Sequence, residues 1–178
     1  MSGPFATATE FCEYTGIGLP SDLARLQSIL AMSSSVIRSF CGQELSVVTD
    51  EEVTVQPSDT ETLVLPERPV TAVSVLEGTV PVTEFTFTRS GLVFRTSGSW
   101  SVPTTVIYTH GYTETEPEFI AIKTICMDSA SRAFTLNERS ASEAMGSTLM
   151  ESAGYSPEVF LTQGEQMRLA DFGKVGVG

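Results

Sequence analysis

The sequence predicts an α+β protein in which a helical frame, with two N-terminal and two C-terminal helices, holds a small antiparallel β-domain inserted in its middle. Two periodicities of apolar residues support this: spacings of three and four at both ends of the chain, and alternation in the middle third. At 178 residues we expect a single domain, 1–178. Its expected parts are N-terminal helices in 1–44, a β-insertion in 45–116, C-terminal helices in 117–172 and a flexible tail in 173–178.

Two N-terminal helices are expected, and an apolar stripe indicates the longer one. Ser21 is expected to cap a long helix whose first turn contains Asp22. Its apolar stripe consists of Leu23, Leu26, Leu30, Ile37 and Phe40. Ser33–Ser35 interrupt that stripe and predict a narrow, closely packed waist, and Gly42 suits the position after the helix. A shorter helix around Ala8–Tyr14 is expected before it.

The middle third alternates with the period of strands that bury one face. The turn signals Glu77-Gly78 and Ser90-Gly91 predict two hairpins within it. The alternating pairs, which predict six short strands, are Val53/Val55, Leu63/Leu65, Val73/Val75, Phe85/Phe87, Leu92/Phe94 and Val106/Tyr108.

The C-terminal part begins at Pro117, which suits the first position of a helix. Helical spacing continues to about Leu136, and the composition of 137–157, rich in Ser, Ala, Gly and Glu, predicts a long exposed loop. Thr162 and Glu165 have the spacing of a capping box and predict a final helix.

The charge balance is strongly acidic: 22 acidic against 10 basic residues give a net charge of −12. This excludes a protein that grips DNA through its phosphates, but not one beside which DNA passes. Residues 44–67 contain seven acids and no base, and we expect the most negative face there. Such a cluster could bind a divalent cation, but it lacks the spacing of a calcium loop, so a solvated acidic face is favoured. The candidate residues of this acidic face are Asp50, Glu51, Glu52, Asp59 and Glu61.

Signals for catalysis are weak, and we predict no catalytic residue, metal or cofactor. His110 is the only histidine, and a role in fixing a turn is favoured over catalysis. Trp100 could stack on a sugar but is more typical of a lid on the β-core. Cys12, Cys41 and Cys126 are expected to be buried free thiols. The sequence also offers no signal peptide and no run long enough to cross a bilayer, so no membrane partner is expected.

Two segments resemble a known family. The first is Leu63-Val64-Leu65-Pro66-Glu67-Arg68-Pro69-Val70 with the strand that follows, and the second is Val106-Ile107-Tyr108-Thr109-His110-Gly111-Tyr112, followed by Pro117. Together they resemble the head-to-tail connector (adaptor) proteins of long-tailed bacteriophages, especially phages of actinobacteria. The residues support this physically, since the two prolines must end one strand and Gly111 permits a turn.

The resemblance implies a structural subunit of the virion neck that is assembled in the bacterial host cytoplasm. It implies a homo-oligomeric ring, usually dodecameric, beneath the portal protein. The ring would join the portal to the next neck protein, a stopper or tail terminator, and let DNA pass without specific binding. Lateral contacts in such a ring are heterologous, so the two side faces of a subunit should differ.

The residues that would perform these roles are hypotheses. From the capped last helix and its tail we expect 162–178 to order on the portal, against the alternative that this helix only closes the helical core. The portal-docking candidates are Glu165, Met167, Arg168, Leu169, Phe172 and Lys174. The acidic candidates named above would lie on the lumen or the tail-side face.

Three other functions stay open at this stage. The first is another neck or tail component, a stopper or tail terminator, although those families are mainly β-barrel or α/β. The second is a carbohydrate- or receptor-binding module built on Trp100, and the last is a small hydrolase that uses His110.

Overall fold

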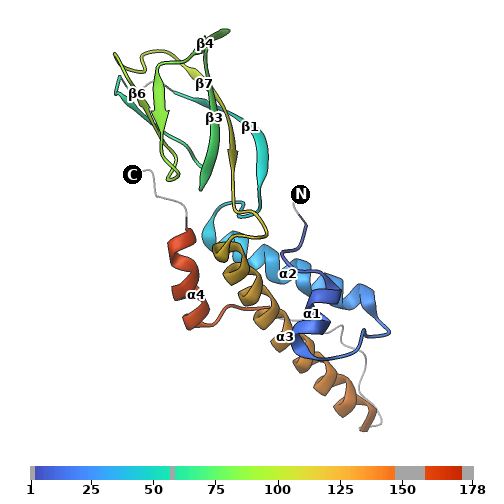
Figure 1. Ribbon diagram of the computed structural model, residues 1–178. Coiled ribbons are helices and arrows are strands. Elements are labelled where there is room, and N and C mark those ends of the chain that lie inside the picture. The colour runs from blue at the N-terminus through green and yellow to red at the C-terminus, as the bar shows by residue number, and fades with distance from the viewer. Residues whose placement is uncertain (1–2, 57–58, 147–158, 174–178) are drawn as a thin grey trace. The chain divides into compact units, whose positions relative to one another are not determined.

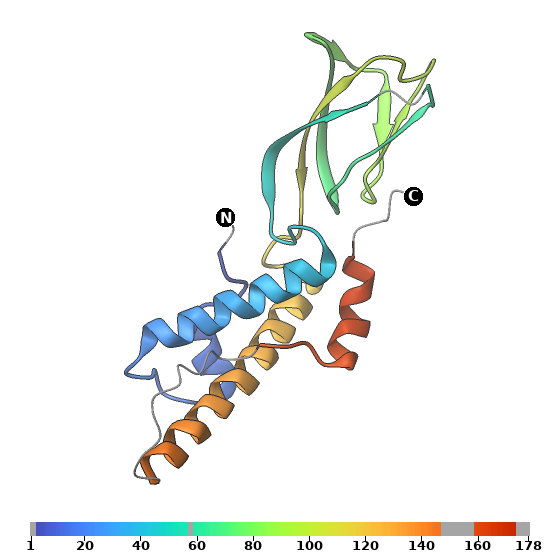
Figure 2. The ribbon, with the colours of Figure 1, turned by 180° about the vertical axis from the view of Figure 1, so that it is seen from behind.

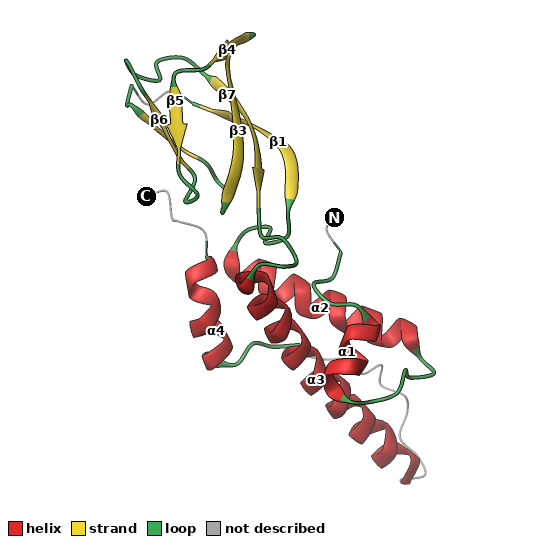
Figure 3. Ribbon diagram, viewed as in Figure 1, coloured by secondary structure: helices red, strands yellow, loops and turns green. Residues whose placement is uncertain are grey.

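The computed structural model of the chain describes residues 3–56, 59–146 and 159–173, and it confirms the mixed α+β class (Figures 1 and 3). Contacts divide the chain into two compact units. The helical unit comprises residues 1–41 and 120–171, and the β-unit comprises 42–119 and 172–178. The β-unit therefore contains the insertion that we expected at 45–116 within one domain.

The helical unit begins with α1 (Ala8–Thr15) and α2 (Leu23–Cys41). A capping box between Thr7 and Glu10 starts α1, and Gly16 ends it in the left-handed conformation. The expected cap of α2 was wrong: the Oδ1 atom of Asp22, not Ser21, accepts a hydrogen bond from the backbone N–H of Arg25 at 3.1 Å. Asp22 is the residue directly before the helix, where a side-chain oxygen can reach the third helical N–H.

The waist predicted in α2 is where this helix meets α3 (Pro117–Gly146). The Oγ atom of Ser34 lies 3.4 Å from Sγ of Cys126 and accepts a hydrogen bond from the backbone N–H of Phe5 at 2.9 Å. Small side chains at the crossing let the two helices approach closely. The predicted stripe is right in its middle, where Leu26, Leu30 and Ile37 are buried. It is wrong at its two ends, because Leu23 and Phe40 are exposed. The buried side of α2 consists of Leu26, Ile29, Leu30, Ser33, Ser34, Ile37 and Cys41.

The course of α3 corrects one expectation. The loop predicted from residue 137 does not begin there, since α3 continues to Gly146. The segment beyond Leu136 contains Glu, Arg, Ala and Met, whose high helix propensities outweigh its serines. Residues 147–158 lie outside the described part of the chain. The unit is completed by α4 (Gln163–Leu169) and a 3₁₀ turn, Ala170–Phe172, whose last residue belongs to the β-unit. Within the described ranges, no helix combines the length and apolarity that crossing a membrane requires.

The β-unit contains two antiparallel sheets that enclose one core. The first has the order β1-β7-β3-β4, from Val48–Val55, Thr104–His110, Val70–Glu77 and Val80–Val82. The second has the order β2-β6-β5, from Thr62–Val64, Leu92–Arg95 and Phe85–Phe87. Both predicted hairpins are confirmed, as β3–β4 and β5–β6. The described strands exceed the predicted six by β4, whose sequence Val-Pro-Val contains a residue that is unfavourable in strands.

Both motifs of the connector resemblance lie at corners of this unit. Residues 65–69 carry the chain from β2 in one sheet to β3 in the other, as the two prolines predicted. The backbone N–H groups of Leu65 and Val70 donate to the carbonyls of Gly91 and Arg89, both at 2.8 Å. This corner is therefore tied to the turn of the β5–β6 hairpin.

At the second corner, Gly111 follows β7 with a φ of +91°. A Cβ atom there would lie 2.2 Å from the carbonyl oxygen of Ser46. Only glycine fits both the conformation and the space. The backbone N–H of Tyr112 then donates to the carbonyl of Leu45 at 2.9 Å, and Pro117 starts α3.

Candidate interaction surfaces

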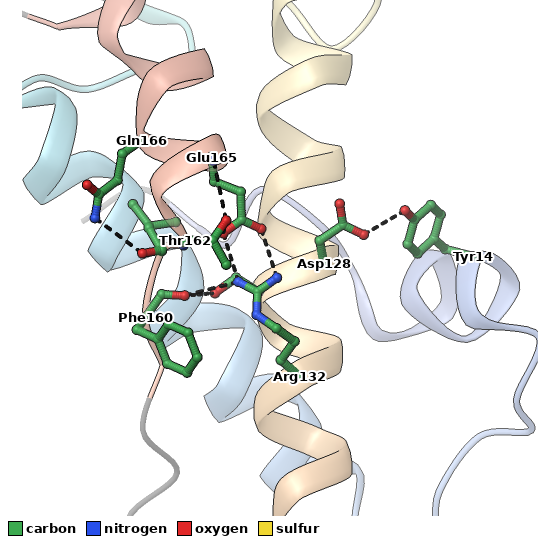
Figure 4. Close-up of polar contacts among 9 residues, drawn as sticks. Tyr14, Asp128, Arg132, Phe160, Thr162, Glu165 and Gln166 are labelled. Carbon is green, nitrogen blue, oxygen red and sulfur yellow. Dashed lines mark hydrogen bonds and ion pairs between the residues drawn. The ribbon is translucent and has the colours of Figure 1, made fainter.

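The last helix was predicted as a docking element, and its position depends on a network with α3 (Figure 4). Arg132 of α3 donates from Nη1 and Nη2 to the two carboxylate oxygens of Glu165, at 2.9 and 2.8 Å. Its Nη2 atom also donates to the carbonyl of Phe160 at 3.1 Å, and its guanidinium lies 5.4 Å from the centre of that ring. A bidentate pair of this kind fixes both the position and the orientation of the carboxylate. Arg132 therefore fastens the start of α4 to α3.

Glu165 is the third residue of α4 and the last of the predicted capping box, which the structure confirms. Its backbone N–H donates to Oγ1 of Thr162 at 3.3 Å, and its Oε2 atom accepts from the N–H of Thr162 at 2.7 Å. Burial raises the pKa of the Glu165 carboxyl, but the hydrogen bonds from Arg132 and Thr162 outweigh burial and lower that pKa overall. The ionised carboxylate is the form that this network stabilises.

The predicted docking candidates differ in how far they are exposed. Glu165 and Leu169 are buried inside the helical unit, so their side chains hold α4 in place and offer no surface to a partner. Met167 and Arg168 are exposed, and 71% of the surface of Met167 is accessible. Lys174 lies outside the described residues.

Phe172, the remaining docking candidate, is half-buried within the β-unit. Its ring packs edge-on against Tyr112, with centroids 5.7 Å apart, and its carbonyl accepts from Nε2 of Gln43 at 2.6 Å. The described residues 162–173 thus make contacts within the chain itself, and the ordering of 162–178 on a portal stays a prediction.

A second polar contact joins α1 to α3 (Figure 4). The hydroxyl of Tyr14 donates to Oδ1 of Asp128 at 2.7 Å, and this hydrogen bond raises the pKa of the tyrosine. Lys123 and Glu10 form an ion pair between the same two helices. The sequence offered no signal for these contacts, because the partners are more than a hundred positions apart.

The acidic candidates of β1 differ in their exposure and contacts. Asp50 and Glu52 are exposed, whereas Oε2 of Glu51 lies 2.5 Å from Nε2 of His110, whose ring is buried. A register shift between Val48 and Glu51 on β1 lies beside this pair, and Asp50 within it has a positive φ of 54°. Glu51 is therefore a part-exposed carboxylate that also contacts the buried ring of His110.

The other two acids, Asp59 and Glu61, are exposed at the start of β2. The carbonyl of Glu61 accepts from Nε1 of Trp100 at 3.0 Å. Nowhere in the described ranges do three or more His, Cys, Asp or Glu side chains converge as a metal site would require.

The residues considered for sugar binding, catalysis or thiol chemistry are all buried. Trp100 is fully buried in the core of the β-unit, so its ring offers no face for a sugar. The ring of His110 is buried and stacks on Tyr108, its neighbour on the same face of β7, with centroids 5.1 Å apart. Cys12, Cys41 and Cys126 are free and buried, as predicted.

Comparisons with known proteins give two findings. A family model described as head completion protein matches residues 4–128, which is more than half of the chain. A solved structure titled "Neck of empty GTA particle computed with C6 symmetry" contains a chain with a similar fold. The TM-score is 0.57 at 12% identity, and the alignment covers 100% of this chain and 95% of that chain. A search of curated proteins found no match.

Proposed function

Because this chain belongs to the head completion protein family, we propose that it forms a ring beneath the portal of a tailed phage and joins the DNA-filled head to the tail. The family is one of structural proteins of the phage head and neck and not of enzymes, and the chain has that structural role in the virion. The resemblance to head-to-tail connectors, which rested on the two corner motifs, is confirmed.

The family match over 4–128 carries this proposal, since it includes the helical frame before β1, the whole β-insertion and the first part of α3. The likeness of the complete fold to a chain in a particle neck supports it. A dodecameric ring is our expectation for the number of subunits, and twelve copies are compatible with six-fold symmetry.

The distribution of charge supports passage of DNA without binding. The chain carries −12, and Asp50 and Glu52 of β1, like Asp59 and Glu61, project into solvent. We assign these acids to the lumen or to the face that meets the next neck protein, a stopper or tail terminator. A negative wall repels the phosphates of the passing genome.

For the portal, the exposed outer side of α4 is the contact that we propose. Met167 supplies an apolar side chain and Arg168 a positive charge, and Arg132 keeps the helix in place behind them. A rigid helix that is already fastened loses little conformational entropy on docking.

The test is electron microscopy of lysates made by a phage that lacks this gene, with the full chain supplied from a plasmid as the control. We expect heads separate from complete tails, and joined virions when the chain is supplied. Normal joined virions in the absence of the gene would overturn the proposal.

A further inference from the structure

A groove on the helical unit lies between the C-terminal half of α2 and the segment that leads into α4. It has a volume of about 550 Å³, and its lining contains no charged side chain. The lining residues are Ser35, Val36, Ser39, Phe40, Phe160, Leu161 and Gln166. Phe40 and Phe160 form two aromatic walls that are 43% and 46% exposed.

The walls of this groove are held in place before anything binds. The guanidinium of Arg132 lies over the ring of Phe160 and donates to its carbonyl, so this aromatic wall is fixed in place. Gln166 donates from Nε2 to the carbonyl of Leu161 at 3.2 Å and fixes the rim. Exposed aromatic side chains around an uncharged hollow are typical of protein–protein contact sites.

The same helical unit carries a projection of matching chemistry, the loop of residues 16–21 between α1 and α2. The loop has the sequence Gly-Ile-Gly-Leu-Pro-Ser and no charge. Its base is held by the N–H of Ile17, which donates to the carbonyl of Cys12 at 3.2 Å. Leu19 is 63% exposed, so the loop presents a large apolar side chain to solvent.

The loop and the groove of one copy cannot meet. The loop adjoins the N-terminal end of α2, as the ribbon in Figure 2 shows, whereas the groove is lined by residues of the C-terminal half of this helix, whose 19 residues span about 28 Å. A projection and a hollow at opposite ends of one rigid helix suit a head-to-tail contact between copies.

The net charge also favours a second copy at these two places. Each chain carries −12, so copies repel one another wherever acidic surfaces approach. The loop and the groove lining are both free of charged residues, so copies can meet there without placing acid against acid.

We propose that Leu19 in the loop of one copy inserts between Phe40 and Phe160 in the groove of the next copy, and that repetition of this contact closes the ring. The inference rests on the proposed function, because it identifies the lateral contact of the same ring.

Disulfide trapping in assembled particles tests this contact. A phage that lacks the gene is complemented with the full chain carrying Leu19→Cys and Ser39→Cys together, and purified particles are oxidised and run on a non-reducing gel. Ser39 is exposed on the groove lining, and the three natural cysteines are buried, so background cross-linking is low. The matched control pairs Leu19→Cys with Ser28→Cys, an exposed position of α2 outside the groove lining.

The expected result is a ladder of linked multimers from the double variant. Each single variant alone gives only monomers, a mixture of the two single variants gives dimers but no higher multimers, and the Ser28 control gives no ladder. Particles that contain the doubly substituted chain but yield only monomers would overturn the contact, as would dimers from Leu19→Cys alone. Particles that form without the chain would instead contradict the proposed function.

Discussion

Arg132 and Glu165 join the two C-terminal helices of the chain through two parallel hydrogen bonds of 2.9 and 2.8 Å. The carboxylate is almost fully buried, and the same guanidinium supports the backbone and ring of Phe160. One side chain of α3 therefore positions both the exposed side of α4, proposed for the portal, and one wall of the groove proposed for a neighbouring copy.

The first prediction is that Arg132→Ala releases α4 from α3. Removal of the arginine leaves a buried carboxylate without its charged partner, which costs about 3 kcal/mol in the free energy of unfolding. Hydrogen exchange should show faster exchange across residues 162–172, and chemical denaturation should show the lost stability. Arg168→Ala, an exposed arginine on the same helix, serves as the control and should leave both unchanged; equal effects from the two variants would contradict the role of Arg132.

The second prediction concerns pH. Because the pKa of Glu165 is lowered in the folded chain, its ionisation contributes stability that is present above the ordinary value of 4.5. This contribution is lost as the pH falls through the lowered folded pKa. Hydrogen exchange in α4, measured at a series of acidic pH values, should show release of the helix below pH 4.5. Glu165→Gln should lose that pH dependence, and an unchanged acid profile in this variant would contradict the assignment.

The third prediction concerns the corner after β7. Gly111→Ala should lower the free energy of unfolding by about 3 kcal/mol or more, since it combines a positive φ with a clash against the backbone of Ser46. Gly98→Ala is the control in the same unit, because Gly98 also has a positive φ but open space around it. It should cost only about 1 kcal/mol. Similar losses in thermal or chemical denaturation would mean that the close approach to Ser46 does not matter.

The fourth prediction separates the acidic residues of β1. Asp50→Asn with Glu52→Gln should leave the free energy of unfolding within about 0.5 kcal/mol, because both side chains are exposed. The pair should slow DNA ejection or weaken binding of the next neck protein. Glu51→Gln should cost about 1–2 kcal/mol, because it weakens the contact with buried His110. Normal DNA ejection and normal binding of the next neck protein in the double variant would contradict a role of these acids in either process.

The fifth prediction is that the thiols are inert in the folded chain. Burial raises the pKa of Cys41 and Cys126 to about 11, so almost no thiolate is present at neutral pH, and Cys12 is also buried. A thiol-reactive dye should label none of the three at pH 7 and all of them after denaturation. Rapid labelling of the native chain would contradict their burial.

Much of the fold could be predicted because its signals are local. Pro66 and Pro69 remove backbone donors within a few residues, so the end of one strand and the corner after it were visible in the sequence. The capping box of Thr162 and Glu165 and the turn at Ser90-Gly91 are local in the same way, and all three are confirmed.

Other features could not be predicted because they depend on distant partners or competing tendencies. The pairing of Glu51 with His110 joins positions 59 apart across a bulge, and that of Arg132 with Glu165 joins positions 33 apart. The end of α3 was missed because serines and glycine in 137–146 compete with residues of high helix propensity. Periodicity showed that Leu169 lies on an apolar face, but not whether that face packs on the chain itself or on a partner.

The most direct test of the central claim is a cryo-electron microscopy map of the neck of intact particles. We predict a closed ring of this chain between the portal and the next neck protein, with the acids of β1 facing the DNA channel or the tail side. A neck whose density between portal and tail contains no copy of this fold would contradict it.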